Sequence, residues 1–324
     1  MEKIFDAIIK HRKIVISVFL IIAAVCAVLS LQVSVNYDMV DYLPKDAQST
    51  AAIKIMEEEF DGNMPNARVM ITNVTTLEAL KYKEKLSKIE GVKSVSWLDD
   101  VIGLDTLKTT PIEFLDSSIV KNYYRDNNAL MTLSIESGKE TTAVNAIYEL
   151  IGENNAVAGD AVNTAKSQEM SVTEVLNAMA ILLPILVIIL IVSTTSWIEP
   201  LFFLSSIGIA VIINVGTNIV YDDISFITLT VSPILQLAVS MDYAIFLLHS
   251  FNDYRMTYEP RKAIVLAMKK SLSTVAASAA TTVAGFAALV FMRFGIGADL
   301  GLNLFKGVLL SFVSVMIFLP AITL

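Results

Sequence analysis

Cysteine, histidine and charge are all scarce in this sequence. Its 324 residues include one cysteine and two histidines, and only 17% of them are charged. Because the single cysteine, Cys26, lies in an apolar segment, the sequence excludes an intramolecular disulfide and a cysteine-based metal site. No phosphate-binding loop, metal-ligand cluster or nucleophile–base pair rises above chance, so the sequence predicts no enzyme, no cofactor and no metal site.

The charges are also unevenly placed. Between Gln32 and Ser171 there are 22 Asp and Glu against 13 Lys and Arg, whereas the whole chain has a net charge of −8. The acidity therefore belongs to one polar segment, and the rest of the chain is apolar and nearly balanced. A mean hydropathy of +0.63 and a hydrophobic content of 55% indicate a membrane protein. The same composition gives no sign of nucleic-acid binding.

Six apolar runs are long enough to cross a bilayer, which takes about 20 residues in a helix. They are 14–31, 176–194, 201–221, 224–251, 272–292 and 300–324. The first run follows the short, basic, amphipathic lead-in 1–13, and a signal peptide is the competing interpretation. The run is longer than a signal-peptide core and lacks a small-x-small exit, so we expect a transmembrane helix.

The polar segment 32–171 has the pattern of a soluble α+β domain. Alternating strand patterns occupy 67–72, 92–97, 129–135 and 156–159, and the predicted helices are 49–60, 75–89, 116–125 and 141–152. Two β-α-β units with a helical insertion between them predict a ferredoxin-like, split β-α-β sandwich. The acidic run 57–59 is interpreted as a solvated helix face, with cation binding as the alternative.

Basic residues indicate which side of the membrane each segment lies on. They gather in the lead-in and in 252–270, which we expect to be an amphipathic helix on the cytoplasmic surface. Four crossings separate the two clusters and place them on one side, as the positive-inside rule requires. The expected domains are 1–31 (cytoplasmic lead-in and first span), 32–171 (extracytoplasmic α+β domain) and 172–324 (five-helix bundle).

An acidic residue interrupts the fourth apolar run. Asp242 lies near the middle of 224–251, where an ionisable carboxyl costs about 2.5–3.5 kcal/mol on insertion scales. Packing alone gives no reason for an aspartate there, so we expect it to load and release a proton during a transport cycle. The alternative is a structural aspartate that caps a broken helix or pairs with a buried base. His249, two turns further on the same face, has the position of an interface residue.

The fifth run carries a packing signal. Small residues recur every four positions in two neighbouring rows, Ala276, Ala280, Ala284 and Ala288, and Ser273, Ala277, Thr281 and Gly285. Such rows allow helix backbones to approach closely in lipid. They predict that this helix is central in the bundle, the alternative being simple alanine-rich filler.

The sixth run places three polar residues on one face. Asp299, Asn303 and Lys306 follow one another at helical spacing. Lys306 has two open interpretations: its side chain extends outward to Asp299, or it joins the charge network around Asp242.

The order of one helix, a soluble domain and five helices resembles half of a transporter of the resistance–nodulation–division (RND) superfamily. Three segments resemble its MMPL branch: Ser196-Trp197-Ile198-Glu199-Pro200-Leu201, Ser240-Met241-Asp242-Tyr243-Ala244-Ile245-Phe246-Leu247 and Phe318-Leu319-Pro320-Ala321. The resemblance implies that Asp242 and Tyr243 take part in a proton relay, that the α+β domain is a porter domain, and that the helices resemble a sterol-sensing domain.

The resemblance implies export of a hydrophobic or lipid-like substrate, driven by the proton-motive force, in a cell membrane. Members of that family have two such halves, so the chain is expected to be a fragment, a half that forms a homodimer, or one half of a split pair. The alternative function, from a different class, is a membrane protein that senses lipid or sterol-like ligands, or serves as a scaffold, without transport. Proton dependence separates the two, because a sensor binds its ligand without dissipating a gradient.

Overall fold

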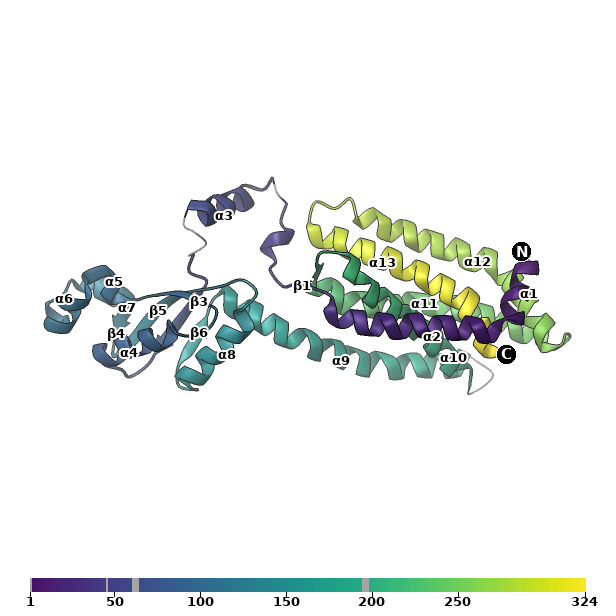
Figure 1. Cartoon of the computed structure of the whole chain (residues 1–324), viewed down its shortest axis with the longest axis horizontal. Coiled ribbons are helices and arrows are strands. Elements are labelled where there is room, and N and C mark those ends of the chain that lie inside the picture. The colour runs from purple at the N-terminus through teal and green to yellow at the C-terminus, as the bar shows by residue number, and fades with distance from the viewer. Residues whose placement is uncertain (1, 45, 60–63, 194–197) are drawn as a thin grey trace. The chain divides into compact units, whose positions relative to one another are not determined.

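The structure is a computed structural model that describes residues 2–44, 46–59, 64–193 and 198–324 (Figure 1). The chain divides into two compact units, a membrane unit (Met1–Pro44 and Ser171–Leu324) and an α+β unit (Lys45–Met170). The first boundary lies at Lys45 rather than at Gln32. The short strand β1 (Val35–Asn36) pairs in parallel with β7 (Ile224–Ser225), which holds the residues after the first span on the membrane unit.

The α+β unit contains a four-stranded antiparallel sheet with one short added strand. Its elements are α3 (Gln48–Glu59), β2 (Ala67–Ile71), α4 (Thr76–Leu86), β3 (Val92–Ser96), α5 (Leu98–Ile102), α6 (Leu104–Thr109), η3 (Ile112–Phe114), α7 (Ser117–Tyr123), β4 (Tyr124–Arg125), β5 (Asn128–Ile135), α8 (Glu140–Ile151) and β6 (Ala156–Ala158). The strand order is β3-β5-β2-β6, and β4 pairs with β5. The units β2-α4-β3 and β5-α8-β6 are therefore interleaved, which is the split β-α-β order.

The core of this unit lies on one face of the sheet. In β2, Ala67, Val69 and Ile71 are buried whereas Arg68 and Met70 are exposed, as the two-residue period of a strand requires. The buried side chains of α4 and α8 belong to the same hydrophobic cluster as those of β2. Both helices therefore cover the same face of the sheet.

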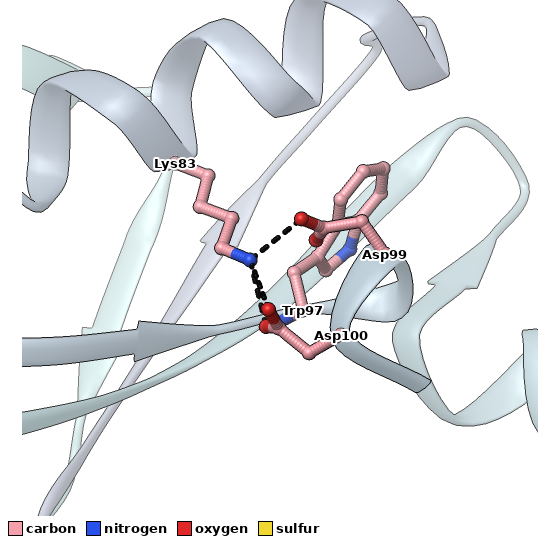
Figure 2. Close-up of polar contacts among 4 residues, drawn as sticks. All are labelled: Lys83, Trp97, Asp99 and Asp100. Carbon is pink, nitrogen blue, oxygen red and sulfur yellow. Dashed lines mark hydrogen bonds and ion pairs between the residues drawn. The ribbon is translucent and has the colours of Figure 1, made fainter. Parts of the chain in front are cut away.

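The insertion between β3 and β5 is fixed by a small polar cluster (Figure 2). The Lys83 ammonium on α4 lies 2.7 Å from carboxylate oxygens of both Asp99 and Asp100 on α5. Trp97 is fully buried, and its indole N–H donates to the Tyr123 carbonyl at 3.0 Å. Lys83 therefore joins α4 to α5, and the Trp97 side chain joins the residue before α5 to the main chain of α7.

The membrane unit is helical. Its helices are α1 (Glu2–Lys10), α2 (Arg12–Leu29), α9 (Asp160–Ser193, which begins in the α+β unit), α10 (Glu199–Gly216), α11 (Phe226–Arg255), α12 (Pro260–Leu289), α13 (Gly295–Val313), a π-helical turn (Ser314–Phe318) and α14 (Leu319–Thr323). In the described part of the chain, six helical segments are long and apolar enough to cross a membrane: Arg12–Gln32, Asp160–Val192, Glu199–Val220, Phe226–Arg255, Pro260–Leu289 and Gly295–Thr323. The six expected spans are therefore present. In the segment 196–200, where the sequence predicts a tight turn, residues 196 and 197 lie outside the described residues, and α10 begins at Glu199.

The expected surface helix 252–270 is wrong. Residues 252–255 end α11, and Pro260 begins α12, which continues without a break to Leu289. Proline is favoured at the first helical position, so the sequence Glu259-Pro260 starts a helix there. Ala263, Ile264, Ala267 and Met268 are buried in the bundle core. The basic residues of this stretch consequently belong to the ends of two membrane helices.

Candidate functional site

Asp242 lies on the outer surface of the membrane unit. It is exposed in the middle of α11. It makes no hydrogen bond or ion pair with any residue that the structure describes. Neither of the structural roles considered for it is observed, because α11 is one continuous helix and no base among the described residues pairs with the carboxyl. Its exposed neighbours along the helix include Phe246 and His249.

Tyr243 points into the bundle. Its side chain is 2% exposed, and its hydroxyl lies beside Ser278 and Thr282 of α12. The Thr282 hydroxyl itself donates to the Ser278 carbonyl at 3.0 Å. A buried phenol that faces two hydroxyl side chains of α12 thus lies next to the helix face that carries Asp242.

The small-residue rows of α12 point outward. Ala280, Ala284, Gly285 and Ala288 are exposed, and a Cβ on Gly285 would meet no atom within 4 Å. Only 11% of the apolar segment of α12 is buried, against 50% for α10, 44% for α11 and 56% for the last span. The expectation that this helix is central is therefore wrong for this unit, because α10, α11 and α13 form its centre.

A buried amide network joins those three central helices. Asn214 on α10 donates to Gln236 Oε1 on α11 at 2.9 Å and to Asn303 Oδ1 on α13 at 3.0 Å. Ser232 donates to Asn303 Oδ1 at 2.5 Å, and Gln236 Nε2 donates to the Ser311 hydroxyl at 3.0 Å. These side chains are at most 2% exposed. Interhelical hydrogen bonds of this kind hold helices together in lipid, where water is absent.

The network has a signal in the sequence that was missed. Ser232, Gln236 and Ser240 recur every four residues on α11, and all three are buried. At 3.6 residues per turn, Asp242 lies about 200° around the helix from Ser240. The two polar faces of α11 are therefore separate, one directed inward to α13 and the other outward.

Lys306 belongs to the inner network. Its ammonium donates to Asn218 Oδ1 at 2.6 Å and to the Asn214 carbonyl at 3.1 Å, and lies 5.1 Å from the centre of the Tyr221 ring. Asp299 instead accepts from the Ser225 amide at 2.7 Å. Among the described residues Lys306 pairs with neither Asp299 nor Asp242. Both interpretations of Lys306 are therefore wrong, and its side-chain partner is Asn218.

A hollow of about 420 Å³ lies in the α+β unit, between the start of α4 and the segment from α6 to η3. Hydroxyl-bearing side chains such as Thr76, Thr109 and Tyr124 line it together with Leu77 and Ile112. The lining combines polar and apolar groups. Among the described residues no group of three or more His, Cys, Asp or Glu is arranged to hold a metal ion.

Comparison with known proteins gives one match. A model of the MMPL family matches residues 41–324, which covers both the α+β unit and the membrane spans from α9 onward. No curated protein matches the chain.

Proposed function

The chain belongs to the MMPL family, a family of multi-pass membrane proteins in the RND superfamily, and on that premise we propose that it forms one six-helix half of an exporter. The family is one of transporters for lipid-like substrates. The proposed activity is export of a hydrophobic or lipid-like substrate, driven by protons that move down their gradient through Asp242.

The observation that carries this proposal is the position of Asp242. The carboxyl is exposed in the middle of a span, and no described residue neutralises it. In contact with lipid it would cost about 2.5–3.5 kcal/mol on insertion scales. A structural residue would not be kept at that cost without a partner, whereas a proton carrier needs a carboxyl that changes its protonation state.

The outward face of the membrane unit that carries Asp242 and the small residues of α12 requires a partner, which is a second six-helix unit. The outward rows of small residues on α12, including Ala284 and Gly285, permit close helix approach in lipid. The unit that covers them would also enclose Asp242 and complete the polar environment of its carboxyl. If that unit is an identical copy, a two-fold axis normal to the membrane brings two Asp242 carboxyls together, and two such groups share one proton.

Tyr243 is assigned a positioning role. Its hydroxyl is a buried donor that lies beside Ser278 and Thr282 of α12. A small shift of α11 against α12 would bring that donor to a group of the covering unit. Protonation of Asp242 would thereby be linked to helix movement.

The orientation follows from the basic end of the membrane unit. Asp6 on α1 and Arg261 on α12 form an ion pair at 2.8 Å, so the lead-in and the start of α12 lie at the same end. The positive-inside rule assigns that end to the cytoplasm. The α+β unit is then the extracytoplasmic porter domain, and its split β-α-β strand order supports that assignment.

The test is proton flux in liposomes that contain the purified assembly and a pH-sensitive dye. We expect a lipid-like substrate to increase proton entry down an imposed gradient, and Asp242→Asn to reduce entry to the level of empty liposomes. Asp126→Asn makes the same chemical change on the α+β unit and should leave the flux unchanged. Substrate binding without any proton movement in the unmodified protein would favour the sensor instead.

A further inference from the structure

Unpaired cations gather where the first two helices meet. Helix α1 ends at Lys10, one residue separates the helices, and α2 begins at Arg12. Lys10 and Lys13 are exposed, and neither they nor Arg12 form an ion pair with any described residue. These cations directly precede the apolar segment of the first span, so they lie at the surface of the bilayer.

The acidic residues of α1 are used in docking the helix. Asp6 pairs with Arg261 at 2.8 Å, and Glu2 lies 3.6 Å from Lys269. Phe5 and Ile9, on the same side of α1, are buried in the core cluster that includes α12. Because Glu2 and Asp6 are both paired with cations of α12, the remaining charge on α1 and on the start of α2 is positive.

Two apolar residues of α1 are exposed. Ile4 is 63% exposed and Ala7 is exposed, whereas Ile8 is half-buried and packs against the core cluster. Ile4 and Ala7 are three residues apart and therefore lie on one side of the helix. A helix with an exposed apolar stripe and adjacent Lys and Arg has the pattern of an interfacial helix, with its apolar side between headgroups and acyl chains.

We infer that α1 and the start of α2 form a binding surface for anionic phospholipid. Ile4 and Ala7 would enter the boundary between headgroups and acyl chains, and Lys10, Arg12 and Lys13 would hold the phosphate and the net negative charge. Each Lys or Arg close to such a surface strengthens binding by about fivefold. A zwitterionic lipid has no net charge to match three unpaired cations, so the surface discriminates between lipid classes. The inference does not depend on transport.

The experiment is native mass spectrometry of the full chain, purified in a neutral detergent, with equal amounts of phosphatidylglycerol and phosphatidylcholine. We expect more phosphatidylglycerol than phosphatidylcholine to remain bound. The pair Lys10→Gln and Lys13→Gln should weaken phosphatidylglycerol binding by about thirtyfold, whereas Lys10→Arg and Lys13→Arg should preserve it. Lys93→Gln with Lys108→Gln removes the same charge from the α+β unit and should change nothing.

Three results would overturn the inference: equal retention of the two lipids, undiminished binding in the Lys10 and Lys13 glutamine pair, or equal loss in the Lys93 and Lys108 control. A second copy on this face is the competing occupant. It would appear as a fall in protein mass by light scattering in Ile4→Gln without a lipid preference, and would also refute the proposal. Helix content and elution volume show that each variant is folded. If the glutamine pair is unfolded, the single variant Lys10→Gln, with an expected loss of about fivefold, decides the question.

Discussion

Gln236 on α11 donates from Nε2 to the main-chain oxygen of Gly307 on α13 at 2.9 Å. The absence of a side chain at Gly307 makes this approach possible, since a Cβ there would lie 2.7 Å from Asn214 Nδ2 and 2.9 Å from Gln236 Oε1. The two central helices therefore meet at a glycine, and the amide network occupies the space that a side chain would take.

Gly307→Ala should destabilise the membrane unit by about 1–3 kcal/mol, because the added methyl group forces the amides of Asn214 and Gln236 apart. Thermal unfolding in detergent measures the effect. Gly208→Ala on α10 is the matched control, since a Cβ there meets no atom within 4 Å and alanine favours a helix. Equal stability of the two variants would show that the close approach is not required.

Tyr243→Phe should reduce proton flux by about tenfold, less than Asp242→Asn does, because it removes one hydrogen-bond donor and no proton carrier. The free energy of unfolding should fall by about 1 kcal/mol at most, which is the net contribution of one hydrogen bond to Ser278 or Thr282. Dye-loaded liposomes and thermal unfolding provide the two measurements. A flux as low as that of Asp242→Asn would place the phenol among the proton carriers.

The variant Lys306→Gln tests whether Lys306 stabilises the fold or takes part in the proton relay. The ammonium donates to Asn218 Oδ1 and to the Asn214 carbonyl, so its replacement should destabilise the fold by about 1–3 kcal/mol. We expect the proton flux per folded protein to be retained. Loss of flux with unchanged unfolding temperature would instead include Lys306 in the relay.

Gly285→Leu should separate the proposed halves. Light scattering corrected for detergent should give the mass of a homodimer or of a complex with a second half for the unmodified protein, and the mass of one chain for the variant. The bulky side chain fills the outward row of α12 and prevents close helix approach. Ala24→Leu adds a similar volume to an exposed position of α2 and should leave the mass unchanged. A stable monomer that transports protons by itself would refute the two-half arrangement.

Single cysteines test the orientation after Cys26 has been replaced. A cysteine at Asp105 on α6 should react with a membrane-impermeant reagent on intact cells, and one at Lys262 on α12 should react only after permeabilisation. The readout is labelling of the purified protein on a gel. Labelling at Lys262 in intact cells would reverse the topology.

The spans and strands could be predicted because their signals are local. Apolar length predicts the six spans, and the two-residue alternation predicts the strands now seen as β2 and β3. The cost of a carboxyl in lipid marked Asp242 without knowledge of its neighbours. The wrong prediction of a helix over 252–270 could also have been avoided from the sequence. Proline is favoured at the first position of a helix, so Glu259-Pro260 indicates that a new helix begins there.

The partners of the polar residues were decided only by the tertiary structure. Small residues on α12 favour close contact equally well with a helix of this unit or of another, and the structure leaves them outward. The spacing of Asp299, Asn303 and Lys306 shows a shared face but not what lies opposite. Opposite them are Asn214 on α10, Asn218 in the 3-10 turn Thr217–Val220 that follows α10, and Ser225. A sequence specifies which face of a helix is polar, because that depends on the helical period. Which helix meets that face depends on how all the helices pack together, and no single segment carries that information.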